Sequence, residues 1–281
     1  MTRDTRLPAV TRPARLELAG STALLTGATG GIGDAIARAL AARGVRLLLS
    51  GRREADLTRL AQDVGAKAIV SDLSVGSDVD RLAAAALDAG ADLLVANAAH
   101  PGTGMLAALT QDEIDLILAV NLRAPIELAR VLAPAMAGRG RGHLVFISSL
   151  SGKSAQPASS LYSATKFGLR GFGLALREDL RGTGVGVSVV APGFIRDAGM
   201  FERTGVKLPP GVGTRTPRDV ADAVIRAIEG NRAEVDVAPL GLRLGSALAS
   251  VAPGPAGWVS SKLGSSRIAT QMDAGHRRRS G

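Results

Sequence analysis

Short apolar runs alternate with longer helical patterns along residues 22–237, and no other feature restricts the fold of this chain as strongly. The runs are nearly continuous in Val, Ile, Leu and Ala, which is typical of strands that are covered on both faces. Repeated strand–helix alternation predicts βαβ units, and therefore an α/β fold with one doubly wound, mostly parallel sheet in a single domain. We expect the strands at Thr22–Thr26, Val45–Ser50, Ala68–Val70, Leu93–Ala96, His143–Ser148, Val185–Ala191 and Glu234–Val237.

Helical patterns fill the intervals between these runs, and two of them begin with clear start signals. Thr110 and Glu113 have the spacing of a capping box. Thr216 is placed to cap a helix that begins with Pro217 and carries Asp219 in its first turn. The expected helices are Ile32–Arg43, Ala55–Asp63, Asp78–Ala89, Gln111–Ala137, Tyr162–Arg181 and Pro217–Glu229.

Composition excludes several classes of protein. The chain has no cysteine, which excludes a disulfide scaffold, thiolate metal sites and a cysteine nucleophile, and which agrees with a reducing compartment. The three histidines, His100, His143 and His276, do not have metal-ligand spacing, so we expect no metal site.

The net charge of +9 is concentrated at the two ends of the chain. Residues 1–20 carry +2 and residues 239–281 carry +5, whereas the residues between them have 24 basic and 22 acidic side chains. The chain also has only seven aromatic residues with which to stack on bases. This distribution argues against a nucleic-acid partner.

A glycine-rich turn stands between the first expected strand and the first expected helix. Glycines at such a turn let a pyrophosphate approach the backbone N–H groups and the helix N-terminus. The alternative is a tight turn without a ligand. The segment reads Thr26-Gly27-Ala28-Thr29-Gly30-Gly31-Ile32-Gly33.

The spacing Gly-x-x-x-Gly-x-Gly behind Thr26 resembles the short-chain dehydrogenase/reductase family. Further elements match the family between about residues 20 and 238. These are Asp72-Leu73 after the third strand, Asn97-Ala98-Ala99 after the fourth, Asn121 in the long helix, Ser149 after the fifth strand, Tyr162-x-x-x-Lys166, and Pro192-Gly193 after the sixth strand.

The resemblance implies a Rossmann-type, NAD(P)-dependent oxidoreductase that forms a homodimer or homotetramer, often packed through helices 111–137 and 162–181. The implied catalytic residues are Asn121, Ser149, Tyr162 and Lys166. The implied cofactor-binding residues are Gly27, Thr29, Gly31, Ile32, Gly33, Arg52, Arg53, Asp72, Leu73, Asn97, Ala98, Tyr162, Lys166, Pro192, Gly193 and Ile195.

The chemistry of these side chains also follows from their types. Tyr162 and Lys166 are four residues apart, on one face of a helix. A free phenol titrates near about 10, and a neighbouring ammonium is expected to lower that pKa. Tyr162 is then the general acid for reduction of a carbonyl and the base for oxidation of a secondary alcohol. Ser149 is expected to orient the substrate oxygen, and Asn121 to hold a water that links Lys166 to solvent.

The end of the second strand favours NADP(H) over NAD(H). Family members that prefer NAD typically have an Asp near position 51, where this chain has Gly51 followed by Arg52 and Arg53. Guanidinium groups can bind a 2′-phosphate bidentately, whereas an acid would repel it. The alternative is that both arginines belong to a solvated helix start.

Three segments lie outside the strand–helix rhythm. Residues 1–20 lack the apolar core of a secretory signal, and we interpret them as a flexible basic leader in front of the catalytic domain, 21–238. The stretch 197–215 is a candidate substrate lid, mostly apolar, which suggests an apolar or acyl-type carbonyl substrate and leaves sugars and steroids open. At Asp197 the family commonly has a Thr that contacts the nicotinamide.

The extension 239–281 mixes apolar and basic side chains. It suits an amphipathic segment on an anionic membrane, or one that packs on its own domain or on a neighbouring subunit. No segment is long enough to span a bilayer. We expect a cytoplasmic enzyme, with membrane association left open; the alternative function is a dinucleotide-binding regulatory or lipid-associated protein without catalysis.

Overall fold

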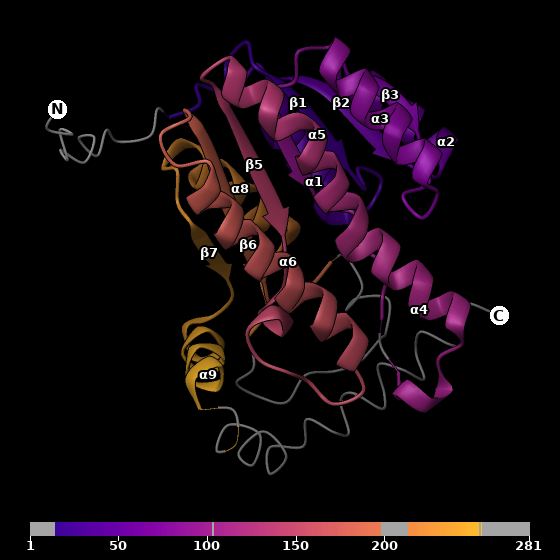
Figure 1. Ribbon diagram of the computed structural model, residues 1–281, viewed down its shortest axis with the longest axis vertical. Coiled ribbons are helices and arrows are strands. Elements are labelled where there is room, and N and C mark those ends of the chain that lie inside the picture. The colour runs from indigo at the N-terminus through magenta and orange to yellow at the C-terminus, as the bar shows by residue number, and fades with distance from the viewer. Residues whose placement is uncertain (1–14, 103, 198–212, 253, 255–281) are drawn as a thin grey trace, which may run out of the picture.

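A parallel seven-stranded sheet forms the centre of the molecule (Figure 1). The structure is a computed structural model that describes residues 15–102, 104–197, 213–252 and 254. The strand order is β3-β2-β1-β4-β5-β6-β7, and it reverses between β1 and β4. The doubly wound fold predicted from the sequence is therefore confirmed, with a topological switch point at the carboxyl ends of β1 and β4. The strands are β1 Thr22–Thr26, β2 Arg46–Gly51, β3 Lys67–Val70, β4 Leu93–Ala96, β5 Gly142–Ile147, β6 Val185–Pro192 and β7 Glu234–Val237.

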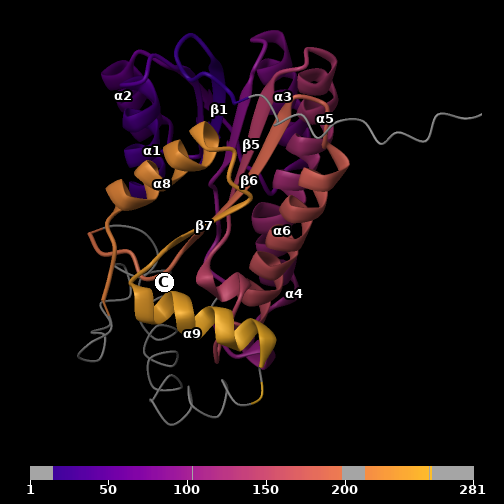
Figure 2. The ribbon, with the colours of Figure 1, turned by 90° about the vertical axis from the view of Figure 1, so that its left-hand side faces the viewer.

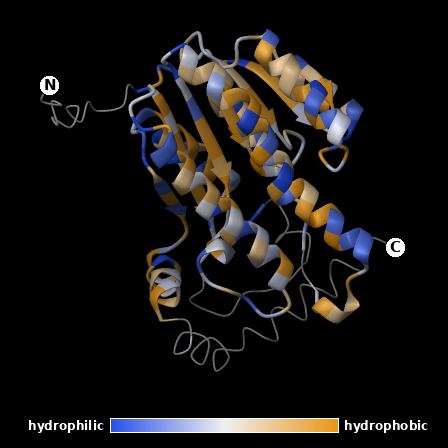
Figure 3. Ribbon diagram, viewed as in Figure 1, coloured by the Kyte–Doolittle hydropathy of each residue, from blue (hydrophilic) through white to orange (hydrophobic). Residues whose placement is uncertain are grey.

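Helices cover both faces of the sheet, as the continuous apolar strands require (Figure 2). Helices α1, α2 and α8 pack on one face, and α3, α5 and α6 on the other. Figure 3 shows predominantly apolar strands between helices of mixed character. The helices are α1 Gly31–Ala41, α2 Glu54–Val64, α3 Gly76–Asp88, α4 Gln111–Leu118, α5 Ala124–Gly138, α6 Ser160–Asp179, α8 Pro217–Glu229 and α9 Leu240–Val251, with short 3-10 turns η1 Leu106–Ala108 and η3 Leu150–Gly152.

Both predicted start signals are confirmed. The Thr110 hydroxyl accepts from the Glu113 N–H at 3.3 Å, and the Glu113 carboxylate accepts from the Thr110 N–H at 2.8 Å. Thr216 and Asp219 form the same reciprocal pair at the start of α8.

The long helix predicted at Gln111–Ala137 is interrupted by a π-helical turn, η2 Ala119–Arg123, between α4 and α5. The Ala124 N–H reaches back five residues to the Ala119 carbonyl. Pro125 explains the interruption, because it has no N–H for the carbonyl of Asn121 and its ring needs room there. The turn lies at a predicted site residue, as π-turns often do.

The predicted flexible leader extends too far. Leu16 and Leu18 are buried in the core beneath α1, and the Ser21 hydroxyl donates to the Leu18 carbonyl at 2.7 Å. The apolar side chains at positions 16 and 18 can bury themselves on the sheet, which the Arg-rich composition of residues 1–20 did not indicate. Residues 1–14 lie outside the described part of the chain.

The base of the predicted lid is closed by a short parallel bridge. Arg196 N–H donates to the Arg215 carbonyl at 2.8 Å, and Arg215 N–H donates to the Phe194 carbonyl at 2.9 Å. Residues 198–212 of the lid are not among those the structure describes.

Helix α9 was not predicted by the strand and helix patterns. It occupies the start of the extension 239–281. Among the helices of the described ranges, none has the length and apolar composition needed to cross a membrane.

Candidate active site

The glycine-rich turn needs glycine at two positions for packing. Gly27 has φ +66°, and a Cβ there would lie 2.7 Å from the Ala98 Cα. A Cβ on Gly33 would lie 2.2 Å from the Gly27 carbonyl oxygen. The turn therefore brings β1, α1 and the loop after β4 closer together than any other residue would permit.

Thr26 and Asn97 tie the two sides of the switch point together. The Thr26 hydroxyl accepts from the N–H groups of Asn97 and Ala98, at 3.1 and 3.2 Å. The Asn97 amide donates to the carbonyls of Thr26 and Gly27, both at 3.1 Å. The sequence motif alone predicts no role for Thr26. Its position directly before the first glycine was the available signal.

The N-terminus of α1 offers backbone donors at this turn. Its N-cap, Gly30, has no side chain to cap the helix, and the first intrahelical bond runs from Asp34 N–H to the Gly30 carbonyl at 2.8 Å. The N–H groups of residues 31–33 thus have no partner within the helix, at its positive end. This donor set fits a dinucleotide pyrophosphate.

Arg52 and Arg53 follow β2, and Arg53 is the N-cap of α2, as the alternative of a solvated helix start expects. Arg53 is exposed, and its guanidinium donates to the Asp56 carboxylate and to the Thr29 carbonyl, both at 2.6 Å. Arg52 is also exposed and acts electrostatically on Asp72. The end of β2 thus carries two guanidinium groups, of which that of Arg53 is already paired with Asp56.

Asp72 and Leu73 follow β3 at the same edge of the sheet. The Asp72 carboxylate accepts from the N–H and the hydroxyl of Ser74, at 2.9 and 2.7 Å. Partial burial raises the pKa of Asp72, but the Ser74 bonds and the Arg52 charge outweigh it and hold the pKa below its usual value. Asp72 is thus kept as an anion.

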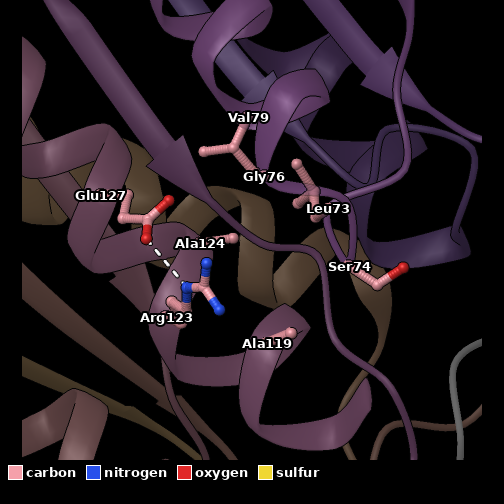
Figure 4. Close-up of a pocket in the computed structure, with 8 residues that line it drawn as sticks. All are labelled: Leu73, Ser74, Gly76, Val79, Ala119, Arg123, Ala124 and Glu127. Atoms are coloured by element: carbon pink, nitrogen blue, oxygen red, sulfur yellow. Dashed lines mark hydrogen bonds and ion pairs between the residues drawn. The ribbon is translucent and has the colours of Figure 1, made fainter. Parts of the chain in front are cut away.

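Leu73 also lines a small pocket between α3 and the π-turn (Figure 4). Arg123 and Glu127 close one side of it with an ion pair of 2.9 Å. Leu73 is the only predicted site residue among its lining residues, which are Leu73, Ser74, Gly76, Val79, Ala119, Arg123, Ala124 and Glu127. The catalytic candidates thus lie outside this pocket.

The structure brings Ser149, Tyr162 and Lys166 together. The Ser149 side chain lies close enough to the Tyr162 phenol to lower the pKa of that phenol. The Lys166 ammonium lies 5.7 Å from the centre of the Tyr162 ring and donates to the Ile147 carbonyl at 2.9 Å. Lys166 is only 2% exposed. A hydroxyl, a phenol and a buried amine thus meet at the carboxyl end of β5.

The protonation of this group differs from the sequence-based expectation. Burial raises the pKa of Tyr162 to about 12, against a smaller lowering by the Ser149 side chain. Burial also lowers the pKa of Lys166 to about 8. Desolvation dominates because the ammonium is held at the Ile147 carbonyl rather than at the phenol oxygen. Tyr162 therefore keeps its proton at neutral pH.

Asn121 lies fully buried in the π-turn and connects two other elements. Its carboxamide oxygen accepts from the His100 N–H at 2.6 Å, and its amide donates to the His100 carbonyl at 3.0 Å and to the Thr165 hydroxyl at 3.4 Å. Thr165 in turn donates to the Tyr162 carbonyl at 2.8 Å. Sequence reasoning missed Thr165, whose only signal is its place inside the Tyr-x-x-x-Lys element.

The last predicted cofactor residues follow β6. The Gly193 N–H donates to the Val237 carbonyl at 3.1 Å, and Ile195 is buried. Asp197, which stands where the family commonly has Thr, has φ +65°, is exposed and pairs with Arg196 at 3.3 Å. This carboxylate faces solvent at the edge of the described chain.

Comparison with known proteins shows the family to which this chain belongs. The family model described as short chain dehydrogenase matches residues 21–207. The ketoacyl reductase HetN of Nostoc sp. is 40% identical over 227 residues, which cover 78% of this chain and 79% of that protein.

Two solved structures are similar along most of their length. A metagenomic short-chain oxidoreductase in complex with NADP is 36% identical with a TM-score of 0.68, and covers 79% of this chain and 99% of its own. A short-chain dehydrogenase from Sphingobium yanoikuyae in complex with NADPH is 27% identical with a TM-score of 0.72. The match covers 84% of this chain and 94% of that structure's chain. The chain therefore belongs to the short-chain dehydrogenase/reductase family and is an oxidoreductase of that family.

Proposed function

We propose that the protein is an NADP(H)-dependent reductase that converts the carbonyl of an apolar, acyl-type small molecule into a secondary alcohol. The observation that carries this proposal is the group of Ser149, Tyr162 and Lys166, in which the buried Lys166 ammonium lies 5.7 Å from the centre of the Tyr162 ring. A protonated phenol is ready to act as a general acid, which is what reduction of a carbonyl needs.

The roles of the side chains follow from their contacts. The bound cofactor would supply the hydride. The Ser149 hydroxyl and the Tyr162 phenol would hold the carbonyl oxygen, and Tyr162 would donate its proton to that oxygen as the alcohol forms. The buried Lys166 amine, with its pKa near 8, would help to return a proton to Tyr162. Asn121 would hold the π-turn in place and would position a water on the proton path.

The preference for NADP(H) rests on charge at the end of β2. Gly51 offers no carboxylate to a ribose 2′-hydroxyl, and the exposed guanidinium of Arg52 stands next to it. A 2′-phosphate would gain charge-assisted hydrogen bonds there. That two similar solved structures contain NADP and NADPH supports this preference.

The acyl-type substrate is supported by the apolar lid sequence and by HetN, which is named a ketoacyl reductase. The competing proposal, a dinucleotide-binding protein without catalysis, does not account for a buried Lys166 beside the Tyr162 ring.

A substrate screen tests the proposed function. NADPH oxidation is followed by absorbance across β-ketoacyl thioesters, β-ketoesters, sugars and steroid ketones, with Tyr162→Phe as the control. We expect turnover with the acyl compounds and a loss on the order of 10²- to 10⁴-fold in the variant, with NADPH still bound by fluorescence titration. Equal rates for the two proteins would contradict the mechanism. NADPH binding without turnover of any carbonyl would favour the non-catalytic alternative.

The resemblance to the family leads us to propose a homodimer or homotetramer packed through α4, α5 and α6. We further propose a peripheral membrane contact through the extension 239–281. It is supported by the row of exposed apolar side chains on α9, Leu240, Leu244, Leu248 and Val251, and by the +5 charge of this extension.

A further inference from the structure

The Ser149 hydroxyl belongs to the compact turn η3. The Ser151 N–H donates to the Ser149 hydroxyl at 3.1 Å, and the Gly152 N–H donates to the Ser149 carbonyl at 2.9 Å. The position of Ser149 relative to Tyr162 therefore depends on how this turn is held against the rest of the molecule.

One side of the turn is fixed by close packing on α6. A Cβ on Gly152 would lie 2.6 Å from the Lys166 carbonyl oxygen and 2.7 Å from the Ser148 hydroxyl. The Ser148 hydroxyl donates to the same Lys166 carbonyl at 2.9 Å. The turn thus rests on the helix that carries Tyr162, while its distal end is closed by bonds from the Lys153 and Ser154 N–H groups to the Leu150 carbonyl, at 2.9 and 3.0 Å.

The distal end carries a buried cation, Lys153, which is only 8% exposed. Its ammonium lies 2.6 Å from the Asp236 carboxylate and 3.1 Å from the Glu234 carboxylate, both on β7. Arg170 of α6 pairs with the same Glu234 at 2.6 Å. A buried cation is costly unless it is paired, so this ion pair selects one position for the end of the turn.

Helix α9 holds the backbone of the same residue. The Ser250 hydroxyl lies 3.0 Å from the carbonyl oxygens of both Lys153 and Ser246, and its one proton is shared between these two acceptors. Residues of β7 therefore bind the Lys153 side chain, and Ser250 of α9 binds the Lys153 carbonyl. Both elements lie more than 80 residues further along the chain.

We propose that Lys153 is a positioning residue that fixes the Ser149 hydroxyl on Tyr162, and that β7 and α9 act on catalysis through it. The inference rests on the proposed function, because Ser149 matters to the reaction only if the protein reduces carbonyls. This effect on catalysis requires no contact of Lys153 or α9 with the substrate or the cofactor.

The test compares Lys153→Met with a matched control, Arg170→Gln. Both variants remove one cation from the same carboxylate cluster, but only Lys153 is attached to the serine turn. Displacing a hydrogen-bonding group from its working geometry should lower kcat on the order of 10- to 100-fold in Lys153→Met, with KM for NADPH unchanged. Arg170→Gln should keep kcat near that of the wild type, and Lys153→Arg, which keeps the cation, should recover most of the lost rate.

Hydrogen exchange of the peptide spanning 149–154 gives a readout that does not depend on activity. We expect faster exchange in Lys153→Met and unchanged exchange in Arg170→Gln. If Lys153→Met does not fold, Asp236→Asn removes the 2.6 Å ion pair with little change in shape, and the same loss of kcat and protection is expected.

The outcomes separate the two proposals. Wild-type kcat in Lys153→Met, or equal losses in Lys153→Met and Arg170→Gln, would overturn the positioning role. If the wild type itself reduces no carbonyl, the proposed function fails. Exchange at 149–154 would then decide whether Lys153 anchors the turn: faster exchange in Lys153→Met supports the anchor, and unchanged exchange overturns it.

Discussion

The proton of Tyr162 is the property on which the proposed chemistry depends most directly. A partly buried phenol beside a buried amine can exchange one proton with it, and desolvation here favours the neutral forms of both. Tyr162 therefore carries its proton before the substrate arrives, but a pKa near 12 makes it a weaker acid than a free phenol, whose pKa is about 10. Oxidation of an alcohol would first need that proton to be removed.

Because Tyr162 is the only tyrosine of the chain, its ionisation can be measured without interference. We expect its phenolate absorbance to appear with a midpoint near pH 12 in the cofactor-free protein. Ser149→Ala should move the midpoint further up, because the Ser149 side chain lowers this pKa. Ser151→Ala is the control and should leave the midpoint in place. A midpoint at or below about 10 would show that the Lys166 charge outweighs burial.

A second prediction concerns the choice of cofactor. The double variant Gly51→Asp, Arg52→Ala should shift the ratio of kcat/KM toward NADH by on the order of 10- to 100-fold, since it removes a phosphate contact and adds a repelling carboxylate. The new side chain fits with a small shift, because a Cβ at position 51 would lie 3.3 Å from the Thr29 hydroxyl.

Arg59→Ala is the matched control for charge, as Arg59 is an exposed α2 arginine that pairs with Asp56. It should leave the ratio unchanged. A wild type that already prefers NADH would contradict the assignment of Arg52.

Strands β5 and β6 and helix α8 meet at a buried histidine that the site does not use. The Ser188 hydroxyl donates to the Arg232 carbonyl at 2.5 Å, so it accepts from the Nε2–H of a neutral His143 at 2.8 Å. Burial, with a smaller effect of the Arg177 charge, lowers the pKa of His143 to about 3. In the unfolded chain the histidine pKa is about 6.5. Between about pH 6.5 and 3, His143 is therefore protonated in the unfolded chain and neutral in the folded protein.

This difference predicts how stability depends on pH. The contribution of neutral His143 is complete above about pH 6.5 and is lost as the pH falls through that value toward 3. Urea unfolding should therefore give a free energy of unfolding that is about 1–2 kcal/mol lower at pH 5 than at pH 7. His143→Gln, which cannot titrate, should flatten this slope. Ser188→Ala should be less stable but should keep the slope, and a wild type without the slope would contradict the argument.

The elements themselves were largely predictable, because each is decided by a local pattern. The seven strands follow from continuous apolar runs, and the starts of α4 and α8 follow from Thr110 and Thr216. The π-turn was not predicted, because only the missing N–H of Pro125 marks it. Helix α9 was expected only as an amphipathic segment, because glycines and serines such as Gly241, Gly245 and Ser246 interrupt its apolar spacing.

The assembly of the whole molecule explains which parts of the site could be read from the sequence. Parallel strands end at one edge of the sheet, so the residues after β1, β4, β5 and β6 had to lie close together. The sequence does not state which groups meet there. The bonds from Asn97 to Thr26 and from Asp236 to Lys153 join residues more than 70 positions apart and depend on the strand order.

The same assembly sets how the protein would meet a membrane. Helix α9 lies at the end of the molecule where the strands have their carboxyl ends (Figure 2), and it turns Ser250 toward η3 while Leu240, Leu244, Leu248 and Val251 are each more than 60% exposed. An apolar row of this kind, on an extension with a charge of +5, should bind anionic vesicles but not neutral ones, and salt should weaken the binding.

Co-sedimentation with anionic vesicles is expected to be lost in the double variant Leu244→Ser, Leu248→Ser and in a chain that ends at Ala238. It should be kept in the control Leu87→Ser on α3. If the full-length protein stays in the supernatant at low salt, α9 packs on another part of this chain or on a neighbouring subunit instead.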